Sequence, residues 1–361
     1  MTVTIRDVAS RAGVSVATVS RALNRSGPVR EATRRRIEEA VKALRYRPNS
    51  AARSLITRRT RLLGVLLPDL HGEFFSELIR GIDHAAQMGG YHLLLSSSHD
   101  NANDLEVALE GMHGRLDGLI VMAPKVEARV LGPLLPANLP IVLLNSAASG
   151  LECDALRIDS FGGARELVVH LAGHGHRRIG IINGPPRNFD AEERLRGYHA
   201  ALDTAGLQRD ERLEVAGDFT ASGGYLAGQQ LLAVRPRPTA IFATNDAMAM
   251  GALSAMLDAG VAVPGDMALA GFDDVSSTQY TIPALTSVRG PISELGARAV
   301  ARLAAAVSAP GTTVHLEESL PVTMVLRRSC GCGEAGGSGS GDVQGGAAGR
   351  DSVPSDQERT A

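Results

Sequence analysis

Residues 62–328 alternate short apolar runs with longer segments whose apolar residues recur at helical spacing. Short apolar runs are typical of buried strands, and the longer segments are typical of amphipathic helices. Strands that alternate with helices imply parallel sheets joined by crossover helices. The predicted strands are 62–67, 92–96, 118–122, 141–144, 178–182, 240–243 and 267–270, and the predicted helices are 75–87, 161–171, 191–205, 223–232 and 247–259.

The number of strands favours a division of this region. About ten strands are too many for one compact sheet of usual width, so we expect two similar α/β lobes. Ligands of such folds bind in the cleft outside the carboxyl ends of the strands.

The charge of the chain is concentrated at its N-terminal end. Residues 1–61 hold fifteen basic and four acidic side chains, a net charge of +11, although the whole chain carries −2. The remainder therefore carries −13, so one end of the molecule is suited to a polyanion and the rest is not. A solvated basic helix face is the alternative interpretation.

The basic head shows the pattern of two short helices and a turn. Thr4 precedes apolar residues at helical spacing, and Asp7 follows it three residues later, which approximates a capping box. Gly13 ends this helix, and Ser15 can cap the next one. A Gly-containing turn between two short helices in a basic module predicts a helix-turn-helix.

A third helix is predicted over residues 31–44 and closes the small core with Ile37, Val41 and Leu44. Three consecutive arginines, residues 34–36, stand near its beginning, where cations oppose the helix dipole. This placement favours an external anion such as phosphate.

Residues 4–9, 13–24 and 44–49 together resemble the head of the LacI/GalR repressor family. The resemblance implies that Val16, Ala17 and Arg21 read base edges in the major groove, since Arg can donate two hydrogen bonds to guanine. Arg30 departs from the family, which usually has a small hydroxyl residue there, so the start of the third helix stays open. The other positions implied to contact or support DNA binding are Thr4, Ser15, Thr18, Ser20, Asn24, Tyr46, Asn49 and Ala52. For Thr18 and Ser20, simple solvation of a helix face remains an alternative.

Residues 50–55 resemble the hinge helix of the same family, which folds only when paired with its twin on DNA. Leu55 matches the leucine that is wedged into the central minor-groove step and bends the duplex. A hydrophobic contact within a linker is the alternative. Paired hinges imply a homodimer on a palindromic double-stranded DNA operator.

The resemblance continues to about residue 328 through the landmarks 117–120, 173–179, 194–198, 244–251 and 271–274. It implies that polar residues contact a small-molecule effector and that aromatic residues pack against it, although core packing is an open alternative for each Phe. A polar to acidic set beside one Arg suits a sugar or nucleoside better than a phosphate or polyacid. The implied effector residues are Phe74, Phe75, Asn145, Asn188, Asp190, Arg194, Phe219, Asn245 and Asp273.

Four regions follow from these patterns. They are a helix-turn-helix head at 1–47, a hinge and linker at 48–61, a two-lobed effector-binding and dimerisation domain at 62–328, and a tail at 329–361. The tail is rich in Gly, Ser and Ala and has almost no large apolar residue, so we expect it to be disordered.

Two other classes of protein share parts of this pattern. Asp273 and Asp274, several His residues and three Cys residues leave an enzyme to consider, but no nucleophile elbow, Walker loop or His-Glu-x-x-His occurs. We expect no cofactor and no metal, because Cys330-Gly331-Cys332 is a lone C-x-C and His174 and His176 match a structural turn of the family.

The second alternative is an extracellular solute-binding protein, which has the same two-lobed body. The N-terminus lacks an export signal and the head is basic, and both features argue against this class. No apolar run is long enough to span a bilayer, so we expect a cytoplasmic protein without a membrane partner.

Overall fold

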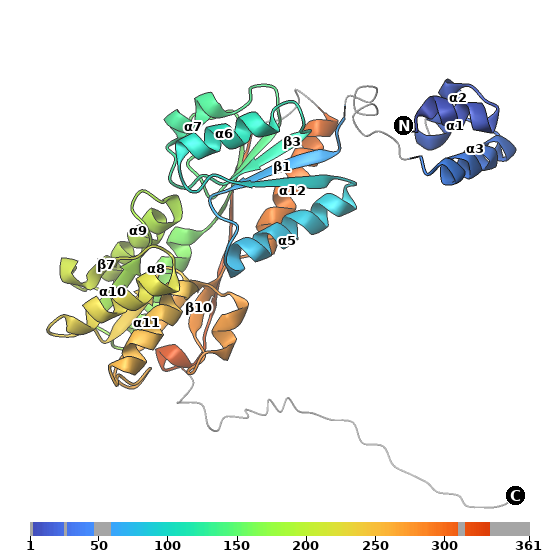
Figure 1. The fold of residues 1–361 in the computed structure, drawn as a ribbon. Coiled ribbons are helices and arrows are strands. Elements are labelled where there is room, and N and C mark those ends of the chain that lie inside the picture. The colour runs from blue at the N-terminus through green and yellow to red at the C-terminus, as the bar shows by residue number, and fades with distance from the viewer. Residues whose placement is uncertain (1–2, 25–26, 47–58, 310–314, 333–361) are drawn as a thin grey trace, which may run out of the picture.

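A computed structural model describes residues 3–24, 27–46, 59–309 and 315–332 (Figure 1). It contains a small helical head and a larger α/β domain of two lobes (Figure 1). The predicted fold class is confirmed, with a helical head followed by parallel sheets. Within the described residues, no helix is both long and apolar enough to cross a membrane.

The head consists of three helices, α1 (Ile5–Ala12), α2 (Val16–Asn24) and α3 (Glu31–Leu44). Their core is formed by Val8 and Ala12 of α1, Val19 of α2 and Ile37 of α3, all of which are buried. Leu44 and Tyr46 lie at the edge of this core. The apolar spacing of each helix therefore produces one common core, as the sequence predicts.

Local hydrogen bonds fix the ends of the head helices. The Asp7 carboxylate accepts from the Thr4 backbone N–H at 2.7 Å and from its hydroxyl at 2.8 Å, which confirms the predicted contact. Gly13 ends α1 in the left-handed region with φ 60°, and the Ser15 hydroxyl accepts from the Thr18 N–H at 3.2 Å at the start of α2. Helix α3 begins directly after Arg30, whose side chain makes no capping hydrogen bond.

The first lobe is a six-stranded parallel sheet in the order β11-β5-β4-β3-β1-β2. Helices α5 and α12 pack together on one face, and α6 and α7 lie on the other. The strands are β1 (Leu62–Leu67), β2 (His92–Ser97), β3 (Gly118–Val121), β4 (Ile141–Leu144), β5 (Asp154–Ile158) and β11 (Glu317–Leu320). The helices are α5 (Glu73–Met88), α6 (Ala102–Met112), α7 (Ala128–Leu134) and α12 (Ile292–Ser308).

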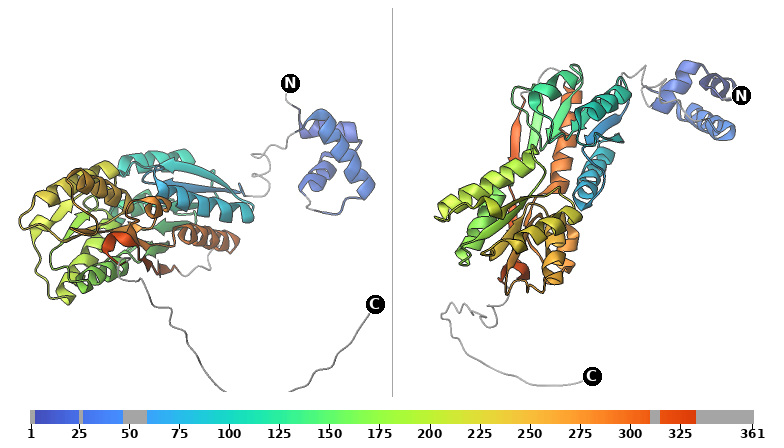
Figure 2. Two further views of the ribbon diagram at one scale, coloured as in Figure 1. Left: turned by 90° about the horizontal axis from the view of Figure 1, so that it is seen from below. Right: turned by 60° about the vertical axis from the view of Figure 1, so that its left-hand side comes forward.

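The second lobe repeats this plan with the order β12-β10-β9-β8-β6-β7, in which only β10 and β12 are antiparallel. Helices α8 and α9 pack together, as do α10 and α11, so both faces are covered (Figure 2). The strands are β6 (Ile179–Asn183), β7 (Glu214–Ala216), β8 (Ala240–Ala243), β9 (Ala268–Asp273), β10 (Thr286–Arg289) and β12 (Thr323–Val325). The helices are α8 (Ser160–Gly173), α9 (Phe189–Thr204), α10 (Ala221–Ala233) and α11 (Asp246–Asp258), with short turns η1 (Glu211–Leu213), η2 (Ser276–Tyr280) and η3 (Arg328–Cys330).

The chain passes between the lobes at three places. It leaves the first sheet after β5 and enters α8, returns after β10 into α12, and leaves again between β11 and β12. Both lobes are thus built from segments that are not contiguous in sequence. The cleft between such lobes is bounded by the carboxyl ends of their parallel strands.

The end of the second lobe lies beyond residue 328, where composition predicted the tail to begin. Ser329 is buried, accepts from the Thr286 N–H at 2.8 Å and donates to the Leu269 carbonyl at 2.6 Å. Cys330 is also buried. The boundary at 329 is therefore wrong for residues 329–332, because hydrogen bonds rather than large apolar side chains hold this segment to the sheet.

Candidate functional site

One face of α2 is turned away from the head core. Val16 is 41% exposed, and Ala17 and Arg21 are exposed as well. Val19 and Ala22 on the opposite side are buried. The three residues that resemble base-reading positions therefore share an outward surface, as side chains at these helical spacings do.

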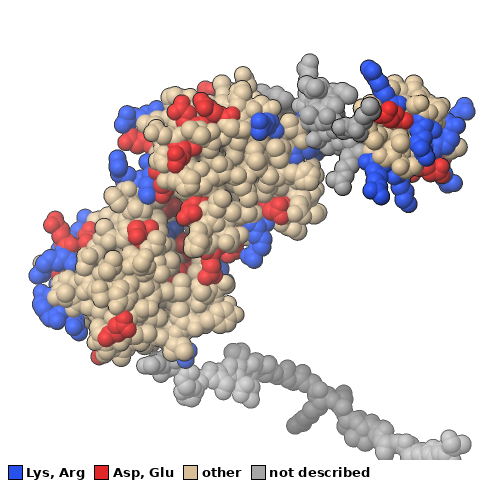
Figure 3. Space-filling view, viewed as in Figure 1, with Lys and Arg blue, Asp and Glu red and all other residues tan. Residues whose placement is uncertain are grey.

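Hydroxyl and amide side chains flank this surface. The Ser15 and Thr18 hydroxyls are 2.9 Å apart, and the Asn24 amide donates to the Ser20 hydroxyl at 3.3 Å. Basic side chains cover much of the visible face of the head (Figure 3). These contacts position polar groups around the outward face of α2, where a polyanion could meet them.

The arginines at the start of α3 have contacts within the head. Arg34 donates from Nη1 to the Ala22 carbonyl at 3.2 Å, and Arg35 lies 3.5 Å from the Glu31 carboxylate. Arg34 thus also ties α3 to the end of α2. Of the sites implied by the resemblance, Asn49, Ala52 and Leu55 lie outside the described residues.

A buried polar cluster lies at the carboxyl ends of strands in the second lobe, with Arg194 of α9 at its centre. Its guanidinium donates to Asp273 Oδ1 at 3.1 Å, to Ser160 Oγ at 3.3 Å and to the Thr244 carbonyl. It also lies 3.8 Å from the ring centroid of Phe272. Only 3% of Arg194 is exposed, so this charge is held by the protein rather than by water.

Two carboxylates share this arginine. The Ser160 hydroxyl, which accepts from Arg194, donates to Asp190 Oδ1 at 3.1 Å. Burial raises the pKa of Asp190, although Arg194 and Ser160 oppose the shift. Burial also raises the pKa of Asp273 to about 6 despite its ion pair with Arg194. We refer to Ser160, Asp190, Arg194, Thr244 and Asp273 as the arginine cluster.

The adjacent carboxylates Asp273 and Asp274 do not form a catalytic pair. Asp274 bonds Arg327 at 2.6 Å and Arg289 at 2.7 Å, whereas Asp273 bonds Arg194. The two carboxylates therefore pair with different arginines, Asp273 with one on α9 and Asp274 with two others. Shared-proton chemistry requires two carboxylates that face each other, and these do not.

Unpaired polar atoms gather at the ends of three strands. Six buried side-chain atoms of the described residues lack a hydrogen bond of ordinary geometry, and three of them are Asn145 Nδ2, Asn183 Oδ1 and Thr244 Oγ1. The Asn145 amide nevertheless lies close enough to Asp190 to lower the pKa of that carboxyl. The three atoms stand at the carboxyl ends of β4, β6 and β8, respectively. Buried polar atoms are nearly always paired, so this arrangement suits hydroxyl or carbonyl groups of a ligand.

Two of the predicted asparagines also cap helices. Asn188 Oδ1 accepts from the Ala191 N–H at 3.1 Å at the start of α9, and Asn245 Oδ1 accepts from the Met248 N–H at 3.0 Å at the start of α11. Asn245 Nδ2 donates to the Phe219 carbonyl at 3.0 Å. These oxygens are therefore already committed to the backbone.

Backbone strain coincides with the candidate site. Asn145, Phe219 and Asp273 have φ of 41°, 67° and 103°, a region that L residues rarely adopt. Such residues cost about 1–3 kcal/mol each and concentrate at ligand sites and switches.

Phe74 and Phe75 lie in the first turn of α5, in the other lobe. Their rings meet edge to face with centroids 5.3 Å apart, and both pack against the core. The neighbouring Glu73 accepts from the Ser276 hydroxyl at 2.6 Å and from the Ser277 N–H at 3.2 Å, so it joins α5 to the second lobe. Burial opposes ionisation of Glu73, but these hydrogen bonds outweigh it and lower its pKa.

Ser160, Thr244 and Asp246 are not among the effector residues that the resemblance implies, although Thr244 and Asp246 lie within its landmark 244–251. Asp246 is buried, accepts from the Ser287 hydroxyl at 2.6 Å and from the Val275 N–H at 2.9 Å, and ties α11 to the second sheet. Burial and the nearby Asp273 raise its pKa well above the ordinary value. The available signal was position: Ser160 follows β5, and Thr244 and Asp246 follow β8. The carboxyl ends of parallel strands converge at one edge of a sheet.

A cavity of about 680 Å³ lies elsewhere, between α6 and the segment after α7. Leu109, Met112, Leu134 and Leu139 line much of it. It lacks the convergent buried charges of the arginine cluster, so we do not assign the effector to it.

The comparisons with known proteins agree with this architecture. Residues 4–49 match the family described as "Bacterial regulatory proteins, lacI family", and residues 168–330 match the "Periplasmic binding protein-like domain". The chain is 37% identical to the HTH-type transcriptional regulator GalR of Salmonella typhimurium over 90% of this chain and 95% of the relative. It is 35% identical to the ribose operon repressor of Escherichia coli over 89% and 98%, respectively.

Solved structures show the same relationship. The Lac repressor dimer bound to operator and the anti-inducer ONPF superposes with a TM-score of 0.85 at 30% identity, covering 91% of this chain and 99% of that one. A LacI family regulator from Enterococcus faecium with bound ribose gives a TM-score of 0.68 at 28% identity, covering 74% and 98%.

A basic helix-turn-helix head joined to a two-lobed domain with a buried polar cluster defines a DNA-binding transcriptional regulator rather than an enzyme. The chain belongs to the LacI family.

Proposed function

We propose that this regulator is a repressor that binds a palindromic operator as a homodimer. In this proposal the head spans 1–47, the hinge spans 48–61, and α2 enters the major groove with Val16, Ala17 and Arg21 toward the bases. The outward face of α2 on a basic head is the observation that carries it. One short helix offers few base contacts, so two heads are needed for specific binding. A two-fold symmetric homodimer supplies them and matches a palindromic operator.

Because it acts on operator DNA, we place the protein in the cytoplasm.

The remaining head residues take supporting roles. Thr4, Ser15, Thr18, Ser20, Asn24 and Tyr46 would contact phosphates or hold α2 in position. The hydrogen bonds of Ser15 with Thr18 and of Ser20 with Asn24 support the positioning role.

We further propose that a sugar or nucleoside binds between the lobes at the arginine cluster. Arg194 is already countered by Asp273 and, through Ser160, by Asp190, so the cluster offers no net positive charge to a phosphate or polyacid. The unpaired Asn145 and Thr244 atoms could instead bond neutral hydroxyls. Phe74, Phe75 and Phe219 would pack against the ligand's apolar face, and Asn188 and Asn245 would line its edge.

Coupling between the two sites would run through lobe closure. The described bridges between the lobes include Glu73 to Ser276 and the Phe189 N–H to the Pro124 carbonyl at 2.9 Å. A ligand that favours one arrangement of the lobes changes the separation of the two hinges in a dimer and hence operator affinity.

The test combines a ligand screen with DNA binding. A thermal-shift screen of sugars and nucleosides identifies the effector, since a ligand at 100 times its dissociation constant adds about 2.7 kcal/mol to stability. Fluorescence anisotropy then measures binding to a duplex from the protein's own promoter region, with excess random DNA. We expect salt-sensitive specific binding that the effector changes.

The outcomes separate the two halves of the proposal. A footprint of one asymmetric half-site per protein contradicts the dimer on a palindrome. Stabilisation by a phosphate or polyacid but by no sugar or nucleoside contradicts the effector class.

A further inference from the structure

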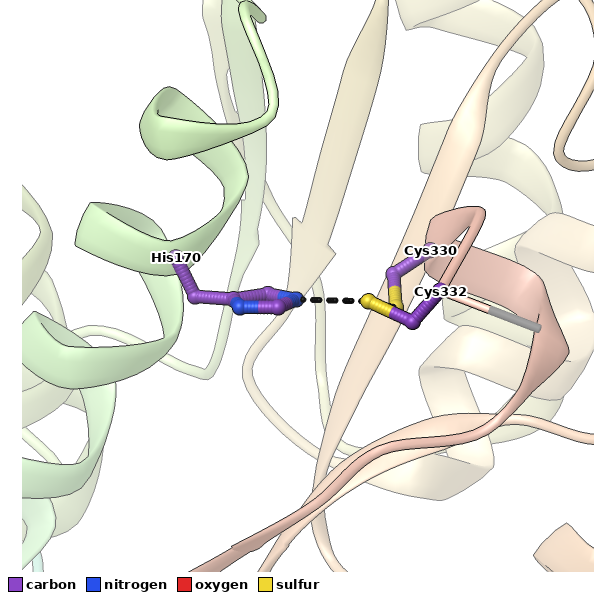
Figure 4. A group of neighbouring side chains, drawn as sticks. All are labelled: His170, Cys330 and Cys332. Carbon is purple, nitrogen blue, oxygen red and sulfur yellow. Dashed lines mark hydrogen bonds between the residues drawn. The ribbon is translucent and has the colours of Figure 1, made fainter. Parts of the chain in front are cut away.

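Two cysteines and two histidines meet at one end of α8. The Cys332 Sγ atom lies 3.2 Å from His170 Nε2, 3.3 Å from His174 Nε2 and 3.1 Å from Cys330 Sγ. Ligand atoms of His170, Cys330 and Cys332 all lie within 4.8 Å of one another (Figure 4). Three metal-ligating side chains thus converge on one point, and the His174 ring lies beside them in contact with Cys332.

The fold brings these residues together from distant parts of the chain. His170 lies in the last turn of α8 and His174 is its C-cap residue, so the two rings share one side of the helix, with centroids 4.6 Å apart. Cys330 ends η3, and Gly331 follows with φ 88°, a left-handed turn that suits glycine and returns Cys332 toward α8.

The cysteine segment is anchored rather than loose. Ser329 bonds both Thr286 and Leu269, and the Thr286 hydroxyl donates to Cys330 Sγ at 3.1 Å. These hydrogen bonds hold the Cys330 sulfur in place beside His170.

We propose that His170, His174, Cys330 and Cys332 form a tetrahedral zinc site. Two thiolates and two imidazoles are the ligand set that Zn²⁺ adopts in structural sites, and an H-x₃-H pair has the spacing found in them. The lone C-x-C of the sequence therefore acquires its second ligand pair from α8. This replaces the expectation, drawn from the cysteines alone, that the chain holds no metal.

The distances around Cys332 require small adjustments, and the His174 ring requires a larger one. Zn–S bonds of about 2.3 Å and Zn–N bonds of about 2.0–2.1 Å at tetrahedral angles separate the ligand atoms by about 3.6–3.8 Å. The Cys332 sulfur lies 3.1–3.3 Å from the Cys330 sulfur and from the two imidazole nitrogens, so these donors must move apart by about half an ångström. The His174 ring must also turn toward His170 and Cys330, because its ligand atom is not among the three that lie within 4.8 Å of one another. Side-chain rotation of Cys332 and His174 provides this movement, because Cys332 is only partly buried and His174 is exposed.

The site is structural in character. Four protein ligands leave no open position for a reacting water, which distinguishes it from a catalytic zinc. Its effect is to tie the end of the folded chain to α8. The same helix begins with Ser160 of the arginine cluster, so the metal braces an element that positions part of the candidate effector site.

Metal binding by the full-length, untagged protein tests the proposal. Reduced protein is loaded with Zn²⁺, desalted and analysed by mass spectrometry for metal content, and Co²⁺ is loaded in parallel for absorption spectroscopy. We expect about one zinc per chain. We also expect the intense visible bands and near-ultraviolet thiolate charge transfer of tetrahedral Co²⁺. Chelation should lower the melting temperature by several degrees.

Matched variants assign the ligands. Cys332→Ser and His170→Ala should lose the bound zinc and the cobalt spectrum while keeping the wild-type far-ultraviolet circular dichroism. Cys153→Ser and His176→Ala are the controls and should bind like wild type, since neither residue belongs to the group of four.

Three results would overturn the zinc site. These are folded reduced protein that binds neither metal, a cobalt spectrum that survives Cys332→Ser, and a metal-free protein with a Cys330–Cys332 disulfide shown by a loss of two mass units. Because none of these measurements involves DNA or a sugar, their outcome is independent of the proposed regulatory function.

Discussion

The candidate DNA-reading face of α2 and the arginine cluster differ in how their charged side chains are placed. On α2 the candidate residues are exposed, close in sequence and surrounded by basic side chains. In the second lobe the candidate residues are buried, come from separate strand and helix ends, and bond one another.

This difference determines how each site responds to change. Exposed charges act on a polyanion additively and are screened by salt. A buried ion pair is insensitive to salt, but loss of one partner leaves an uncompensated charge in the interior. Single substitutions should therefore be severe in the cluster and graded in the head.

The largest effect is expected for Arg194→Ala. Removing the guanidinium leaves Asp273 and Asp190 buried without their cation, which should cost about 3–5 kcal/mol of stability and abolish the effector response. Thermal unfolding and effector-dependent anisotropy measure the two effects. Operator affinity below the unfolding transition should stay near wild type.

Arg196→Ala is the matched control on the same helix. Arg196 is exposed and pairs with Glu193, so its loss should change stability by less than about 0.5 kcal/mol. Equal destabilisation by the two substitutions would show that the cluster has no special role.

Arg21→Ala should have the next largest effect. If Arg21 donates to a guanine edge, specific operator binding weakens by about 1–3 kcal/mol, and binding to random DNA changes much less. Competition anisotropy gives the ratio of the two affinities. Arg11→Ala removes an equal charge from α1 and should leave that ratio unchanged, so a similar fall in both variants would argue against base reading by α2.

Acid should weaken effector binding by about tenfold between pH 7.5 and pH 5. The Asp273 carboxylate, with a pKa of about 6, is ionised at the higher pH and largely protonated at the lower one. If only the protein with ionised Asp273 binds the effector, the apparent affinity falls in proportion to the ionised fraction, which is about tenfold smaller at pH 5 than at pH 7.5. Calorimetric titrations at several pH values measure it, and the residual binding of Asp273→Asn should be flat across this range.

The raised pKa of Asp273 also determines whether this residue stabilises or destabilises the folded protein as the pH changes. Because the folded-state pKa lies above the ordinary value of 3.8, the folded protein binds the proton more tightly than the unfolded chain. The contribution of Asp273 therefore destabilises above pH 6 and is relieved as the pH falls toward 4.

The smallest effect is expected for Glu73→Gln, which keeps one acceptor for Ser276 but removes the charge between the lobes. Effector affinity should weaken by about 0.5–1 kcal/mol, with operator affinity in the absence of effector unaltered. Glu77→Gln, at a half-buried position four residues along α5 beside the exposed Arg80, is the control. An unchanged affinity in Glu73→Gln would mean that this bridge does not contribute to closure.

Local patterns in the sequence predicted the head, seven strands and five helices of the two lobes, but not α6, α7, α12 or the strands β5, β7, β10 and β12. Helix spacing and end-capping residues lie within a few positions of each other, as Thr4 with Asp7 and Ser15 with Thr18 show. The strand at Glu317–Leu320 was not predicted, because a polar strand at the sheet edge lacks an apolar run.

The candidate sites were predictable only in part. Resemblance supplied Arg194 and Asp273, but Ser160 became apparent only when α8 and α9 were placed together. The pairing of Cys332 with His170 likewise depends on how the chain end folds back, which no local pattern records.

The coupling of the two sites is tested most directly by reciprocal binding. Calorimetry measures the affinity of the effector selected by the screen with and without saturating operator duplex, and anisotropy measures operator affinity with and without saturating effector. If the sites are linked through one pair of conformations, both affinities must change by the same factor, which we expect to be about 5–150. An effector affinity that is identical on and off the operator would contradict the account.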